Sequence, residues 1–85
     1  MSSQKATRKD TTVLTPKLCK AARALLEWTA VDLAEQSGVG VTSIRVFEST
    51  GTASRLTLIV LERTFADEGL DFISGGVVFR ELEAA

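Results

Sequence analysis

The sequence predicts a mainly α-helical domain of four helices that ends in a short β-hairpin. Apolar residues recur at helical spacing in four successive segments between Thr15 and Glu68, and each segment follows a Thr, Ser or Gly suited to the position before a helix. After Gly69 the pattern changes to two short apolar runs around Ser-Gly-Gly, which is typical of a hairpin. A length of 85 residues fits one such domain with a small core, so we expect dimerisation to add stability.

The composition favours a globular protein over a disordered, membrane-spanning or zinc-binding one. A hydrophobic content of 45% and a charged content of 25% are typical of a globular chain. No apolar run approaches the about 20 residues of a membrane span, and the polar start lacks the apolar region of a signal peptide, so we expect a cytoplasmic protein. With no His and a single Cys, the chain has no set for a usual zinc site or a Ser-His-Asp triad. We therefore expect no metal, no cofactor and no enzymatic activity, and a buried thiol at Cys19.

The first helix is predicted over residues 16–28. Thr15 is suited to cap the start of this helix. Pro16 suits the first helical position, because the N–H that proline lacks has no hydrogen-bond partner within the helix there. Residues 1–14 show no periodicity and are predicted to form a flexible basic arm, so the domain proper is expected to cover residues 15–85, including the hairpin.

The second and third helices are predicted on either side of a glycine turn. Thr29 and Asp32 have the spacing of a capping box, which marks the start of the second helix. Gly38 is suited to end that helix because glycine adopts positive φ without strain. The third helix is predicted over residues 41–48, with Ile44 and Phe47 on its inner face.

The remaining residues are predicted to form a loop, a fourth helix and the hairpin. Residues 49–54 are rich in Ser, Thr and Gly, which indicates a loop. Ser54 is then suited to cap a helix over residues 55–68. The hairpin is predicted at residues 70–80, where the alternating side chains expected to point inward are Leu70, Phe72, Val77 and Phe79.

The segment from Ala30 to Ser49 resembles the helix-turn-helix of the Cro/phage-repressor class, also called the Xre family. The wider stretch, roughly residues 14–80, is similar to small bacterial regulators, in which an Ala-Arg-Ala-Leu-Leu helix and a Trp precede the motif and a Gly-rich hairpin closes the chain. The resemblance implies a compact λ-repressor-like domain that binds DNA and regulates transcription. The residues at the spacing of the motif are Ala34, Gly38, Val39, Ile44 and Phe47.

The resemblance also implies roles for particular residues. Proteins of this class often pair an Arg of the first helix with a Glu at the end of the third, and Arg23 and Glu48 hold those positions. The base-reading positions of the class correspond to Val41, Thr42, Arg45 and Val46. An Arg can donate two hydrogen bonds to guanine, and a Val can pack on a thymine methyl.

Phosphate contacts have to come from other positions than is usual in the class. The common phosphate-binding Gln of the second helix is replaced by Ala30, and the usual hydroxyl cap of the third helix is replaced by Gly40. We therefore expect the phosphates to be held by the start of the second helix, by the arm, and by Thr29, Ser43, Ser49, Thr50 and Arg55.

The charge distribution bears on the partner. Residues 1–28 hold six Lys or Arg and two acids, whereas residues 29–85 hold four and nine, so phosphate attraction is concentrated near the N-terminal end. A single helix-turn-helix with so few phosphate contacts binds DNA weakly, so we expect a homodimer on double-stranded DNA with an inverted-repeat operator. The apolar hairpin residues either pair with a second copy or cover the fourth helix; they are Phe72, Val77, Val78 and Phe79.

An alternative function is that of an adaptor or antiactivator, which keeps the same fold but binds a regulatory protein. The apolar Val41 and Val46 at reading positions and the net charge of −1 favour this alternative. The basic arm is likewise open to two interpretations, a solvated tail or a contact to the minor groove. Binding to random duplex over a series of salt concentrations separates the two functions, because phosphate contacts depend on salt.

Overall fold

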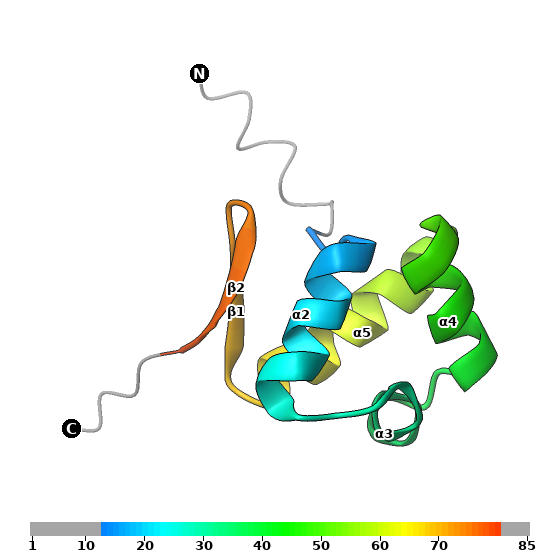
Figure 1. Cartoon of the computed structure of the whole chain (residues 1–85), viewed down its shortest axis with the longest axis horizontal. Helices are drawn as coiled ribbons and strands as arrows, with labels where there is room; N and C mark the ends of the chain where they lie inside the picture. The colour runs from blue at the N-terminus through cyan, green and yellow to red at the C-terminus, as the bar shows by residue number, and fades with distance from the viewer. Residues whose placement is uncertain (1–12, 81–85) are drawn as a thin grey trace.

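Four α-helices and one antiparallel β-hairpin follow one another along residues 13–80, the part of the chain that the computed structural model describes (Figure 1). The mainly α-helical class with a C-terminal hairpin is thereby confirmed. None of the described helices is long and apolar enough to cross a membrane. The elements are α2 (Pro16–Leu26), α3 (Ala30–Ser37), α4 (Val41–Thr50), α5 (Arg55–Asp67), β1 (Leu70–Ile73) and β2 (Gly76–Phe79).

Helix α2 begins where it was predicted to begin but ends two residues earlier. The Thr15 hydroxyl accepts a hydrogen bond from the backbone N–H of Leu18, as expected of a cap. At the other end Glu27 takes a left-handed conformation with φ of 59°, and the N–H groups of Glu27 and Trp28 bond to carbonyls of the last turn. The early turn directs Trp28 inward, where its ring stacks on Phe65 with centroids 6.2 Å apart.

Helices α3 and α4 are joined by a turn of three residues, Gly38 to Gly40. The predicted capping box is present, since the Thr29 hydroxyl accepts from the N–H of Asp32 and the Asp32 carboxylate accepts from the N–H of Thr29. Gly38 adopts a φ of 85°, and its N–H bonds to the carbonyl of Ala34 at 2.8 Å. The turn therefore has the glycine geometry that the sequence predicts.

Helix α4 is two residues longer than predicted. Ser49 and Thr50 belong to the helix and not to the following loop, because their hydroxyls bond back to the carbonyl of Val46 and so stay satisfied within the helix. The helix ends at Gly51, whose φ of 85° reverses the chain. Helix α5 starts at its predicted cap, Ser54, and ends one residue earlier than predicted.

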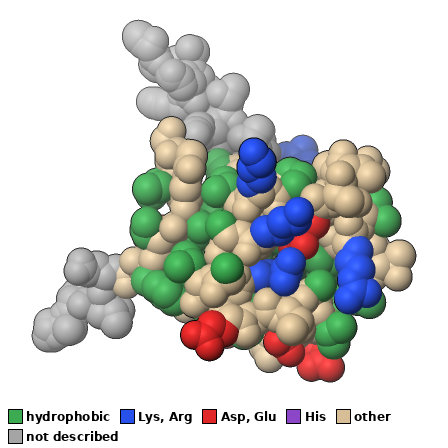
Figure 2. Space-filling model, viewed as in Figure 1, with side chains coloured by type: hydrophobic (Ala, Val, Ile, Leu, Met, Phe, Trp, Pro, Cys, Tyr) green, Lys and Arg blue, Asp and Glu red, His purple; other side chains and the backbone are tan. Residues whose placement is uncertain are grey.

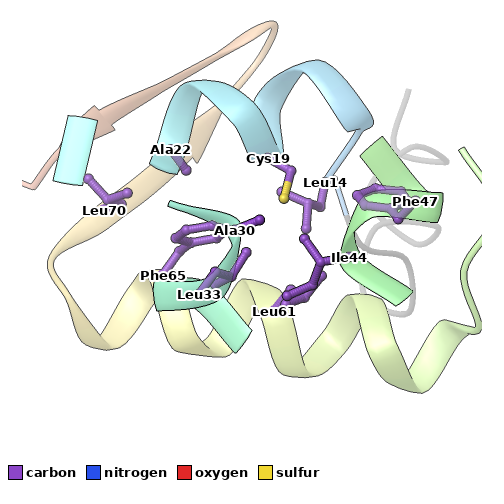
Figure 3. Close-up of a cluster of buried hydrophobic side chains, with 10 residues drawn as sticks. All are labelled: Leu14, Cys19, Ala22, Ala30, Leu33, Ile44, Phe47, Leu61, Phe65 and Leu70. Atoms are coloured by element: carbon purple, nitrogen blue, oxygen red, sulfur yellow. The ribbon is translucent and has the colours of Figure 1, made fainter. Parts of the chain in front are cut away.

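One apolar core receives side chains from every helix and from the start of the hairpin (Figure 3). Leu14, which was assigned to the flexible arm, is buried in this core and corrects the boundary of the arm. The N–H groups of Val13 and Leu14 donate to the Glu62 carboxylate at 2.6 and 2.8 Å, which fixes the chain entering α2. Residues 1–12, the rest of the predicted arm, lie outside the described residues. The core residues are Leu14, Cys19, Ala22, Ala30, Leu33, Ile44, Phe47, Leu61, Phe65 and Leu70.

The hairpin packs its first strand against α5 and its second against α2. Leu70 is opposite Phe79 and Phe72 is opposite Val77, so these four side chains share one face as predicted. Phe79 is nevertheless 52% exposed, because it lies at the end of β2 while its partner Leu70 takes the buried place. The Arg80 guanidinium closes this end of the hairpin with hydrogen bonds to the carbonyls of Ala66 and Leu70.

Candidate functional site

The outward face of α4 is the first part of the candidate site. Ile44 and Phe47 turn into the core, which leaves the opposite side of the helix in solvent. Three of the four predicted base-reading residues, Thr42, Arg45 and Val46, are exposed there. The fourth, Val41, is half-buried and packs against the core, so its contribution to a contact surface is smaller than the sequence indicated.

The predicted phosphate-binding hydroxyls divide into two groups by their own hydrogen bonds. Ser49 and Thr50 each donate their one O–H to the carbonyl of Val46, at 3.3 and 2.8 Å. The Thr29 hydroxyl instead accepts from Asp32, and Ser43 is exposed on α4. A phosphate oxygen needs a donor, so in this conformation Thr29 and Ser43 suit it better than Ser49 and Thr50 do.

A shallow groove of about 370 Å³ borders α4. It lies between α4 and the start of α5, where the backbone N–H groups of the first turn give a positive end to the helix dipole. Arg55, the last of the predicted phosphate contacts, is the first residue of α5 and is exposed. The sequence pattern does not predict this groove, which is lined by five hydroxyl-bearing and two apolar residues: Thr42, Ser43, Val46, Thr52, Ala53, Ser54 and Thr57.

The predicted ion pair joins α2 to α4 and is confirmed. Arg23 donates from Nε to Glu48 Oε2 at 2.9 Å and from Nη2 to Oε1 at 2.8 Å, a two-point contact that also orients the guanidinium. Its Nη1 donates to the carbonyl of Trp28 at 3.1 Å. The pair therefore ties three segments together: α2, α4 and the turn that follows α2.

The electrostatics of the pair involve two further residues. Burial by itself would raise the pKa of Glu48, but hydrogen bonds from Arg23 and Cys19 and the charges of Arg23 and Lys20 hold that pKa below its usual value. Burial, and then the hydrogen bond to Glu48, raise the pKa of the Cys19 thiol. Cys19 is fully buried and has no disulfide partner, so it stays a protonated thiol beside the carboxylate, as expected of a core cysteine.

Basic side chains gather over α2 and α4 on one face of the molecule, while acidic side chains lie mainly at its lower edge (Figure 2). Lys17 and Lys20 of α2 and Arg45 of α4 are exposed cations of these two helices. The two lysines belong to the basic N-terminal end of the sequence but to none of the predicted contact sets. The spacing of Lys20, one helical turn before Arg23, could have indicated that it lies next to α4.

Two of the four residues of the predicted dimer surface are partly covered by the core, and the other two are exposed. Phe72 and Val77 are half-buried against the core, and Phe72 meets the ring of Phe65 edge-on at 6.0 Å. Val78 and Phe79 are 42% and 52% exposed and so remain accessible. Ile73, 52% exposed, was missed, although the alternation that places Phe72 inward also places Ile73 outward.

No protein-family model matches the chain, and no curated protein matches it significantly. The function is therefore inferred from the exposed face of α4, its two flanks and the contacts that hold them.

Proposed function

We propose that the chain is a sequence-specific DNA-binding regulator of transcription, of the helix-turn-helix type found in Cro and phage repressors, which acts as a homodimer on an inverted-repeat operator. One observation carries this proposal. Two short helices meet at a glycine turn, and the second of them exposes Thr42, Arg45 and Val46 while its other side is locked into the core. An exposed helix held from behind has the form of a major-groove reader.

In this proposal α4 lies in the major groove. Arg45 donates two hydrogen bonds to O6 and N7 of a guanine, Thr42 bonds to a base edge, and Val46 packs on a thymine methyl. The phosphates on either side of α4 are held by the N–H groups at the start of α3, by Ser43 and by Arg55 at the start of α5.

The acids of α3 and α4 do not oppose this arrangement. The Asp32 carboxylate accepts the N–H of Thr29 in the capping box, and the Glu48 carboxylate is paired with Arg23. Glu35 is exposed on α3, where a carboxylate is solvated. Two of the three acids of α3 and α4 are therefore engaged in contacts within the domain and do not face the phosphates in this arrangement.

Dimerisation supplies the affinity that one such surface lacks. We propose that the exposed hairpin residues Val78 and Phe79, together with Ile73, pair around a two-fold axis. Such an axis places two copies of α4 in successive major grooves about 34 Å apart on one side of the DNA. Doubling the phosphate contacts also doubles the dependence of binding on salt.

The test is a selection of bound sequences from a library of random duplex DNA, followed by binding measurements on the enriched sequence. The proposal predicts an inverted repeat with half-site centres about one helical turn apart, and affinity that falls steeply with salt. Failure to retain any duplex at low salt would reject it.

A second candidate function is an adaptor that binds another protein through the same face. It is favoured by exposed apolar residues on and near the helices of the motif, since Val46 is 41% and Val31 45% exposed. The same selection separates the two, because an adaptor does not enrich a DNA sequence and its binding to duplex is weak at every salt concentration.

A further inference from the structure

We infer that Lys20 of α2 contacts the phosphate backbone of the bound DNA beside α4, an inference that rests on the proposed function. Lys20 is exposed and forms no ion pair with a described residue. It belongs to neither the base-reading set nor the phosphate set predicted from the sequence. Three features of the structure place its ammonium next to the reading face.

The first feature is the bridge between α2 and α4. The two-point contact of Arg23 with Glu48 fixes the side of α2 that carries Arg23 against the side of α4 that carries Glu48. Lys20 lies one turn before Arg23 on α2, and Arg45 lies one turn before Glu48 on α4. Each of these two cations is therefore on the same side of its helix as the residue that forms the bridge. The bridge is neutral as a whole and is flanked by two exposed positive charges.

The second feature is the direct electrostatic effect of Lys20 on α4. The positive charge of Lys20 contributes to lowering the pKa of Glu48, although the two residues are on different helices. The packing of α2 against α4 allows this charge to act between the two helices. Figure 2 shows Lys and Arg side chains gathered over α2 and α4 on the face in view.

The third feature is the arrangement of the two flanks of α4. Ser43 lines the groove on one side of Thr42 and Val46, whereas Arg45 continues the other side of α4, where Glu48 binds Arg23 of α2. A helix in the major groove lies between two phosphate strands. The side of α4 that carries Ser43 then faces one strand, and Lys20, with its flexible four-carbon stem, reaches the other.

The experiment compares Lys20→Gln with the parent protein on a random-sequence duplex of about 25 base pairs, with affinity measured by fluorescence anisotropy over about 50 to 200 mM salt. Loss of one phosphate contact should reduce the slope of log affinity against log salt by about 0.9 for each bound protomer. Lys20→Arg should retain the parent slope, because a charged donor remains at the same place. On the selected operator, Lys20→Gln should weaken binding without changing which bases are preferred.

Arg63→Gln is the matched control. Arg63 is an exposed cation that shares a side of α5 with Leu56 and Ile59, away from the buried Leu61 and Phe65, and its removal changes the net charge by the same amount. Equal slopes for the parent, Lys20→Gln and Arg63→Gln would overturn the role of Lys20 while leaving the proposed function intact. A parent protein that binds no duplex would reject the proposed function, and this inference with it.

Discussion

Replacing Glu48 with Gln should lower the free energy of unfolding by about 3 kcal/mol, a magnitude that follows from the bonds it breaks. Glu48 is 9% exposed and accepts two hydrogen bonds from Arg23, at 2.9 and 2.8 Å. Gln keeps the shape and one acceptor oxygen, but its NH₂ group meets an N–H of Arg23 in place of the second acceptor. A hydrogen bond to a charged group contributes about 1.5 to 3 kcal/mol, and the Arg23 charge also remains partly buried without a counter-charge.

The assay is urea unfolding followed by the fluorescence of Trp28, the only tryptophan of the chain. Trp28 reports on this region directly, because its carbonyl accepts from Arg23 and its ring stacks on Phe65. Glu35→Gln, the same chemical change at an exposed position of α3, is the control and should alter stability by less than about 0.5 kcal/mol. If Glu48→Gln unfolds at the same urea concentration and with the same slope as the parent, the bridge does not stabilise the fold.

The pH dependence of stability provides a second reading of the same bridge. Burial opposes the ionised form of Glu48, but hydrogen bonds from Arg23 and Cys19 outweigh it and hold the pKa below the ordinary 4.5. A carboxyl group whose pKa is lower in the folded state contributes stability above its unfolded pKa, and this contribution is lost as pH falls through the folded value. The difference in stability between the parent and Glu48→Gln should therefore be largest at neutral pH and shrink below about pH 4.5. A difference that is constant from neutral pH to pH 3 would contradict this account.

Three further sets of substitutions test the proposed base-reading face, the proposed dimer, and the contact of Glu62 with the backbone before α2. Arg45→Ala should lose about 1 to 3 kcal/mol at one base pair of each half-site and relax the preference there, whereas Arg55→Ala should weaken all sequences alike; equal loss on operator and random duplex for Arg45→Ala would refute base reading. Val78→Lys and Phe79→Lys should give folded monomers with weaker operator binding, measured by sedimentation and anisotropy, and an unaltered protein that is already monomeric on and off DNA would reject the dimer. Glu62→Gln should destabilise the fold by about 1 to 2 kcal/mol, because both N–H groups before α2 donate to one charged carboxylate oxygen and a neutral amide oxygen accepts them more weakly. An unchanged thermal midpoint for Glu62→Gln would show that the burial of Leu14 suffices to hold this segment.

Much of the candidate site could be predicted because its parts are specified by short-range spacing. The exposed Thr42, Arg45 and Val46 follow from the helical period of Ile44 and Phe47, since a helix that buries one side leaves the other in solvent. The pair of Arg23 and Glu48 was found only through the resemblance, because 25 residues separate them and no local rule connects them. The groove beside α4 was missed for the same reason, since it forms where the starts of two helices meet.

The sequence by itself determined the helix starts, the glycine turn and the hairpin. Thr15, Thr29 with Asp32, and Ser54 each bond to a backbone N–H within three residues, so these caps depend only on nearby chain and are visible in the order of residues. Tertiary structure decided the points at which packing between distant segments outweighs local preference. Beyond the end of α2 at Leu26, Trp28 stacks on Phe65 of α5, and Leu14 lies in the core with its N–H bonded to Glu62, also on α5. The charge of Lys20 likewise acts on Glu48 because the fold packs α2 against α4.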